Sequence, residues 1–287
     1  MDHRRFLDRH PLAVYTGITY AISWTFWGLW AAVPDAGDLP STALYVAGGF
    51  GPVLAALLLI RASGRPVRPW LRRTFRVRAR PRYYLIALTL PVAAVALAGA
   101  AHAGVLGGTV TPEAVESPLA YPIFLGVVLL FFGGQEEPGW RGYLLPRLQE
   151  SHSALRSALA IGVVWAFWHL PLFVLPGTIQ NDIVFPLYVV NLLALSVVLT
   201  WVTNGANGSV LPAMLLHAGS NAVVNYYPVG GPDGAVSVTG YGLLTAVVVL
   251  VAIALVRGYG PGELAPVDEQ PATPAGGNGS PGSAGRP

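Results

Sequence analysis

The sequence contains no cysteine and no lysine, and only 11% of its 287 residues are charged. The absence of cysteine excludes disulfide bonds, thiolate metal sites and cysteine-protease chemistry. A soluble globular chain carries about a quarter charged residues, because water must wet its surface. This chain lacks that polar cover, since 53% of its residues are hydrophobic and its mean hydropathy is +0.54. The composition therefore predicts an integral membrane protein.

Apolar runs recur along the chain near the length of about twenty residues that a helix needs to cross a bilayer. The first follows a basic start, as in a signal peptide, but it exceeds a typical h-region and further runs follow it. One such run alone could be a buried helix of a soluble protein, whereas many in a chain of low charge argue against that reading. We expect an all-α bundle of about eight transmembrane helices, at 11–33, 42–60, 83–104, 119–145, 155–175, 183–202, 208–226 and 240–256.

The arginines fall on one side of this arrangement. With alternating connections, every arginine except Arg141 and Arg156, which lie in or beside helices, falls in a connection on the side of the N-terminus. The connections on the other side hold acidic residues and no arginine. Short cytoplasmic loops are enriched in basic residues. We therefore predict a multi-pass protein of the bacterial cytoplasmic membrane with both termini in the cytoplasm.

Two segments differ from the helices in composition. Residues 61–82 hold nine arginines interleaved with aromatic and aliphatic residues. Such a cluster attracts anionic lipid by about 1 kcal/mol per charge, although a solvated loop that only fixes the topology explains it equally well. Because this loop lies against the bilayer, we expect no nucleic-acid partner. Residues 258–287 are rich in Pro, Gly, Ala and Ser and read as a disordered tail behind a transmembrane domain of residues 1–257.

Few polar side chains fall inside the expected spans, and ionisable groups at membrane depth are functional candidates. The set is Glu136, Glu137, Arg141, His169, His217 and Asn221, with Asn225 near a span end. Glu137 and Arg141 are four residues apart, as are His217 and Asn221, so each pair shares a helix face. Glu136 points about 100° away from Glu137. Trp165 precedes His169 by one turn and is expected to wall the same cavity.

This set contains the groups that peptide hydrolysis needs. A carboxylate beside a neutral imidazole can orient a water and take its proton. A second histidine and an amide on another helix can donate to the oxyanion of the attacked carbonyl. Taken singly, the residues have structural explanations, because a buried Glu137–Arg141 pair neutralises itself and a lone His or Asn often joins helices. Zinc on Glu136, His169 and His217 stays open chemically, but the sequence has no compact ligand spacing, so we expect no cofactor.

Three motifs resemble one known family, the CPBP membrane proteases, also called the CAAX-processing and bacteriocin-processing or ABI family. EEPGWRGYLLPRL at 136–148 resembles its EExxxR motif, WAFWHLPLFVLPG at 165–177 its aromatic–histidine motif, and HAGSN at 217–221 its HxxxN motif. The usual phenylalanine of the second motif is Trp165 here. The motifs occur in order over about residues 118–226, which would form the protease core.

The resemblance implies an eight-helix bundle that cuts a membrane-associated peptide or protein in or beside the bilayer. The family was long described as metal-dependent, but a glutamate-dependent mechanism without metal fits it better, and zinc remains the alternative. Glu136 and His169 would activate the water, His217 and Asn221 would stabilise the oxyanion, and Glu137 with Arg141 would support the site. Two other functions remain open at this point. A catalytically silent immunity or scaffold protein could keep the same residues, and a proton- or cation-coupled transporter could use the two glutamates, although the sequence lacks the internal repeat of many transporters.

Overall fold

The computed structural model describes residues 10–33, 38–109, 117–230 and 235–266. Within these ranges the chain is helical, with one isolated bridge between Gly230 and Val236. The predicted all-α fold is confirmed. The main helices are α2 (Pro11–Ala32), α3 (Asp38–Gly49), α4 (Gly51–Ala62), α5 (Val67–Thr74), α6 (Pro81–Val105), α7 (Tyr121–Phe131), α10 (Ala154–Trp168), α11 (Phe185–Gly205), α12 (Leu211–Ala222) and α13 (Val238–Tyr259).

Proline and serine mark where these helices begin. Five long or central helices, α2, α4, α6, α11 and α12, carry a proline in their first turn. At that position the missing N–H has no intrahelical acceptor, so proline costs nothing there. The helices α10 and α13 instead begin after Ser153 and Ser237, whose hydroxyl oxygens accept the amides of Arg156 and Gly240. The breaks in the apolar pattern of the sequence therefore coincide with physical start signals.

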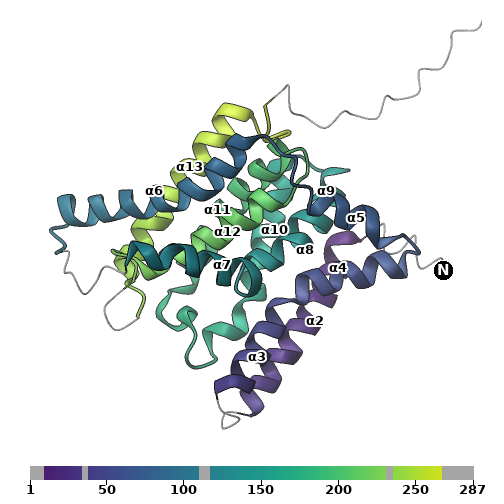
Figure 1. The fold of residues 1–287 in the computed structure, drawn as a ribbon, viewed down its shortest axis with the longest axis horizontal. Helices are drawn as coiled ribbons and strands as arrows, with labels where there is room; N and C mark the ends of the chain where they lie inside the picture. The colour runs from purple at the N-terminus through teal and green to yellow at the C-terminus, as the bar shows by residue number, and fades with distance from the viewer. Residues whose placement is uncertain (1–9, 34–37, 110–116, 231–234, 267–287) are drawn as a thin grey trace, which may run out of the picture.

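The helices α10, α11 and α12 form the middle of the bundle, and α6 and α13 flank them opposite the α2–α4 hairpin (Figure 1). Helix α11 packs on both α10 and α13, while α12 packs on α6, α7 and α11. Most of the side chains along α11 are buried, including small polar residues such as Ser196, Thr200 and Thr203. Helix α12 is therefore surrounded by other helices, and most of its residues face the inside of the bundle.

The number of membrane spans is not confirmed by the described residues. Three helices, α6, α11 and α13, are long and apolar enough to cross a membrane. A fourth span results if α3 and α4, which meet at an angle of 49°, count as one broken helix. Each expected span corresponds to helical segments, but α10 is shorter than a full crossing and the fourth span is not one helix.

The C-terminal segment stays on the bundle longer than the sequence predicts. Disorder was expected from residue 258, but the described chain continues to residue 266, with Leu264 fully buried. The carbonyls of Pro261 and Gly262 accept the amides of Leu155 and Ala154 at 3.1 and 2.6 Å. These amides belong to the first turn of α10 and have no acceptor within that helix, so the segment after α13 acts as its cap. The remainder of the expected tail lies outside the described residues.

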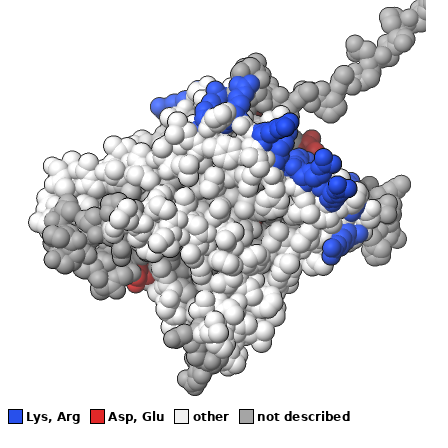
Figure 2. Space-filling view, in the orientation of Figure 1, with Lys and Arg blue, Asp and Glu red and all other residues white. Residues whose placement is uncertain are grey.

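Basic side chains gather along one edge of the molecule, over α5 and its neighbours (Figure 2). The described arginines other than Arg141 come from three stretches of the chain, namely residues 61–82, 147–156 and 257. The rest of the visible face is almost free of charge (Figure 2). This distribution matches a bundle whose uncharged sides face lipid and whose basic end meets water.

Candidate active site

The two glutamates lie in a break of the fourth expected span, which was predicted as one helix over 119–145. Helix α7 ends at Phe131, and a 3-10 turn (Gly134–Glu136), a short α8 (Glu137–Gly139), a π-helix (Trp140–Leu144) and α9 (Leu145–Gln149) follow. Gly133 begins the break with a φ of +154°, a conformation that glycine adopts without strain. The correction has a local cause, because two glycines and Pro138 remove the side chains and the N–H that would continue the helix.

Gly133 also makes room for the third motif. A Cβ at this position would lie 2.6 Å from Nδ2 of Asn221 and 2.9 Å from Nε2 of His217, so any side chain would displace them. Gln135 holds the turn, because its Oε1 accepts the Gly133 amide at 2.7 Å while its Nε2 donates to the Phe131 carbonyl at 3.1 Å. The backbone of the first motif therefore lies directly against the side chains of α12.

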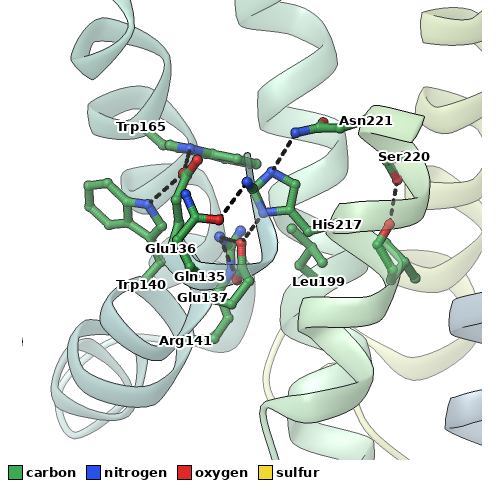
Figure 3. A network of polar contacts seen from close by, with 12 residues as sticks. Gln135, Glu136, Glu137, Trp140, Arg141, Trp165, Leu199, His217, Ser220 and Asn221 are labelled. Atoms are coloured by element: carbon green, nitrogen blue, oxygen red, sulfur yellow. Dashed lines mark hydrogen bonds and ion pairs between the residues drawn. The ribbon is translucent and has the colours of Figure 1, made fainter. Parts of the chain in front are cut away.

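Glu136 is 5% exposed and points away from Glu137, as its position on the helix predicted. Its Oε2 accepts two indole N–H groups, that of Trp165 at 2.8 Å and that of Trp140 at 3.4 Å (Figure 3). Among the described residues no group donates to Oε1. One oxygen is thus held by neutral donors, and the other is left to a molecule in the adjoining cavity.

Glu137 is fully buried, and an arginine and a histidine contact it instead. Its Oε2 lies 3.1 Å from Nη1 of Arg141, and its Oε1 lies 2.8 Å from Nδ1 of His217 (Figure 3). Arg141 also donates to the Ser196 hydroxyl at 2.9 Å, and that hydroxyl donates to the Ala158 carbonyl at 2.6 Å. The predicted Glu137–Arg141 pair is confirmed, and its network connects five helical segments, namely α8, the π-helix, α10, α11 and α12.

His169 ends α10 and is 7% exposed. Its Nδ1 lies 2.8 Å from the Trp165 carbonyl. A carbonyl oxygen only accepts, so Nδ1 carries the proton and Nε2 of the neutral ring is an acceptor. The indole of Trp165 stands beside both histidines, with ring centroids 6.0 Å from His169 and 4.9 Å from His217. Trp165 is therefore a common wall for the three motifs.

His217 and Asn221 share a face of α12, as predicted. Because Nδ1 of His217 donates to Glu137, its Nε2 accepts in the neutral ring, and Nδ2 of Asn221 lies 3.3 Å from it. The same Nδ2 donates to the Phe132 carbonyl at 2.8 Å. Both N–H bonds of the amide are thus engaged in this state, and an oxyanion would have to replace one of them or meet a protonated His217.

A cavity of about 280 Å³ joins these groups. Glu136, Trp165, His169, His217 and Asn221 all line it, which confirms that the predicted site residues converge. Asn225 also reaches it, but Glu137 and Arg141 do not and lie behind its wall. The remaining wall is mostly apolar and comes from α6, α7, α11 and α13, with residues such as Leu90, Phe131, Leu192 and Val248. The cavity accordingly suits a mainly apolar chain with a few polar anchor points.

Several polar residues of the site were missed by the sequence. Ser196 and Trp140 bind the motif residues, and Tyr188 places its ring 5.3 Å from His169. Gln180 is 6% exposed and lines the cavity, and its buried Oε1 has no hydrogen-bond partner among the described residues. The sequence predicted that Gln180 lies in a loop outside the bundle, where a polar residue is ordinary and does not indicate a functional site. Trp140 alone was detectable, because it follows Glu136 by four residues.

The residues were also tested as a metal site. Across the part of the chain that is described, no three side chains of His, Cys, Asp or Glu lie close enough to hold a metal ion. In the set Glu136, His169 and His217, Nδ1 of each histidine donates to a protein oxygen, which a zinc-bound histidine also does, but Nε2 of His217 faces Nδ2 of Asn221. The described side chains therefore do not form the three-ligand cluster of a zinc site.

Comparisons with known proteins address the motif-bearing stretch. Residues 118–223 match the family of Rce1-like type II CAAX prenyl endopeptidases. A stretch of 96 residues is 28% identical to CAAX prenyl protease 2 of Methanococcus maripaludis, covering 31% of this chain and 35% of that protein. The chain thus matches about a third of the length of this curated relative. The stretch that carries the three motifs is thus similar to Rce1-like sequences, and the resemblance to the CPBP membrane proteases is confirmed.

Proposed function

We propose that this chain is a CAAX-type intramembrane endopeptidase in which Glu136 and His169 activate the hydrolytic water. The observation that carries the proposal is the cavity, because it brings a buried carboxylate with one free oxygen together with an imidazole whose Nε2 is an acceptor. Two acceptors can orient one water by its two O–H bonds, which is the arrangement that general-base catalysis needs.

In this mechanism Oε1 of Glu136 takes a proton from the water as its oxygen attacks the peptide carbonyl. His169 holds the water through Nε2 while its Nδ1–H remains on the Trp165 carbonyl. When the C–N bond breaks, the proton on Glu136 passes to the leaving amine, so the carboxylate is restored. A carboxylic acid in a cavity with neutral donors can both receive and return a proton.

The oxyanion of the tetrahedral intermediate would be stabilised from α12. Asn221 would turn one N–H from His217 or from the Phe132 carbonyl toward it, and a protonated His217 would donate through Nε2. Glu137 would hold that ring in position, because it accepts from Nδ1 of His217. Arg141 and Ser196 act as positioning residues, since they fix Glu137 and do not line the cavity.

The substrate class follows from the wall of the cavity. Apolar side chains dominate it, and Glu136 is its one described carboxylate. We propose a membrane-associated peptide or protein whose residues near the cut are uncharged. A prenylated peptide ending in a CAAX sequence is the first compound to test, because the relative is named for that substrate.

The orientation in the membrane remains a proposal as well. The edge that carries the arginines (Figure 2) would face the cytoplasm, together with both termini. Reporter fusions at Gly260 should then read as cytoplasmic, and fusions at Glu113 should read as external. A fusion at Gly260 that reports from outside would overturn this orientation.

The decisive experiment is cleavage of that peptide by the purified protein, followed by mass spectrometry of the products. Glu136→Gln keeps the size and the acceptor for Trp165 but removes the base, so the rate should fall by about two to four orders of magnitude. Glu150→Gln is the matched control, because this carboxylate lies outside the cavity and should change little. A Glu136→Gln protein that cleaves at the wild-type rate would contradict the mechanism.

A further inference from the structure

The segment between α10 and α11 (Figure 1) supplies part of the cavity wall through a short 3-10 turn, η6 (Ile179–Asp182). Gln180 of this turn lines the cavity and is 6% exposed, and its Oε1 is buried without a hydrogen-bond partner among the described residues. The Tyr188 hydroxyl interacts with the same amide, but it does not engage this oxygen. A buried acceptor without a donor destabilises a folded chain, so Gln180 does not stabilise the fold through this oxygen.

The neighbours of Gln180 fix this turn relative to His169. The Thr178 hydroxyl and Nδ2 of Asn181 both donate to backbone carbonyls of the preceding 3-10 turn, η5 (Leu170–Phe173). The turn η5 begins directly after His169, so these hydrogen bonds hold η6 against the segment that carries the imidazole. The side chain of Asn181 is therefore occupied by the backbone, and Gln180 presents its amide to the cavity.

Gln180 differs from the other amide side chains of the cavity wall. Each of the other four donates a hydrogen bond to a protein oxygen, namely Gln135, Asn191, Asn221 and Asn225. The free oxygen of Gln180 can be paired only by a molecule in the cavity. A peptide that enters a mostly apolar cavity needs acceptors for its main-chain N–H groups, because an unpaired N–H away from water costs free energy. The acceptor and this need are complementary.

We propose that Gln180 is a substrate-binding residue whose Oε1 accepts a main-chain N–H of the peptide beside the bond that is cut. This role rests on the proposed endopeptidase function and adds recognition of the substrate backbone to it. Glu136, His169 and the residues of α12 surround the scissile group in that mechanism, so the N–H belongs to a neighbouring peptide group. A backbone contact tolerates many side chains at this substrate position, but it excludes proline, which has no N–H.

The test removes the donor from the substrate and the acceptor from the protein, singly and together. The substrate is the prenylated CAAX peptide of the cleavage assay, in which each peptide group near the cut, except the scissile one, is changed in turn to an ester. The ester puts an oxygen in place of the N–H and keeps every side chain. The wild type should lose about fivefold in kcat/KM at one position, as expected for one neutral hydrogen bond. Proline at that position should be cleaved at least as poorly as the ester.

Gln180→Met removes the acceptor at nearly constant volume. The kcat/KM for the all-amide peptide should fall by about fivefold. The ester at the sensitive position should then cost nothing further, because both changes remove the same contact. Gln149→Met is the matched control, since Gln149 is a partly buried glutamine of α9 whose Nε2 also lacks a partner in the described chain, but it lies outside the cavity. It should leave both kcat/KM and the ester effect unchanged.

Thermal unfolding without peptide distinguishes a binding role from a structural one. Gln180→Met should leave the melting temperature unchanged or raise it, because it removes an unpaired buried acceptor. Thr178→Val removes a hydroxyl that holds the turn and should lower the melting temperature. An equal decrease for Gln180→Met would overturn the binding role, and so would an ester effect that persists undiminished in Gln180→Met.

Binding to the Glu136→Gln protein separates this inference from the proposed function. The affinity of a fluorescent form of the peptide is measured by anisotropy, for the all-amide peptide and for the esters. If the wild type does not cleave the peptide, but Glu136→Gln protein prefers the amide about fivefold and the added Gln180→Met abolishes that preference, the binding role stands and the hydrolase fails. Cleavage that is equal for the amide and every ester would remove the role of Gln180 and leave the hydrolase in place.

Discussion

Trp165→Phe tests how this chain differs from the family pattern, which has phenylalanine at this position. The change keeps an aromatic wall and removes the indole N–H that Glu136 accepts at 2.8 Å. A hydrogen bond to a charged group contributes about 1.5–3 kcal/mol, and about 1.4 kcal/mol corresponds to one pH unit in a titration. The base must be ionised to accept a proton, and the N–H stabilises the ionised form. The acidic limb of the kcat/KM profile should therefore move to higher pH by about one to two units.

The assay is the pH dependence of peptide cleavage by the purified variants. Above the limb, Trp165→Phe should retain activity within about tenfold of the wild type, because the reacting groups are intact. Trp168→Phe is the matched control, since Trp168 also lines the cavity but its buried Nε1 has no partner among the described residues. It should leave the limb in place. A uniform loss of activity in Trp165→Phe without movement of the limb would refute the role of this hydrogen bond.

Three further outcomes follow from the site. Asn221→Ala should lower kcat by about two to three orders of magnitude, as loss of one oxyanion donor does, with a smaller change in KM in the same cleavage assay. Arg141→Ala should lower the melting temperature measured by differential scanning fluorimetry, because stranding the buried Glu137 costs about 3–5 kcal/mol. Elemental analysis should find no stoichiometric zinc, and activity should survive a chelator. Activity that is lost to the chelator and restored by zinc would recast Glu136 and His169 as ligands.

The sequence predicted those parts of the site that depend on local helix geometry. Spacing of four residues placed Glu137 with Arg141 and His217 with Asn221, and both contacts occur. The different directions of the two glutamates followed from the angle of about 100° between neighbours in a helix. The contact between His217 and Glu137 was not predictable, because 80 residues separate them and no local rule fixes how α12 rotates against the first motif.

The errors of the sequence-based predictions have a common physical origin. A hydropathy pattern measures only the length of an apolar stretch, so it predicted one helix over α7, the two carboxylates and the π-helix despite the glycines between them. It also treated the small, polar residues after α13 as disordered. Their backbone carbonyls nevertheless cap α10, and the side chain of Leu264 is buried against the bundle. The amino-acid composition of a segment does not indicate whether its backbone groups form hydrogen bonds with other elements.

Adjacent glutamates with the same chemistry receive different tasks through their partners. Glu137 meets a guanidinium and an imidazole, so its charge is compensated by a partner in direct contact. Glu136 meets only indole N–H groups, so its charge lacks a counter-ion in direct contact and its second oxygen is left to the cavity. Exchanging the two roles would require moving Arg141 by one position along the helix. The i and i+4 spacing of the first motif therefore decides which carboxylate can serve as the base.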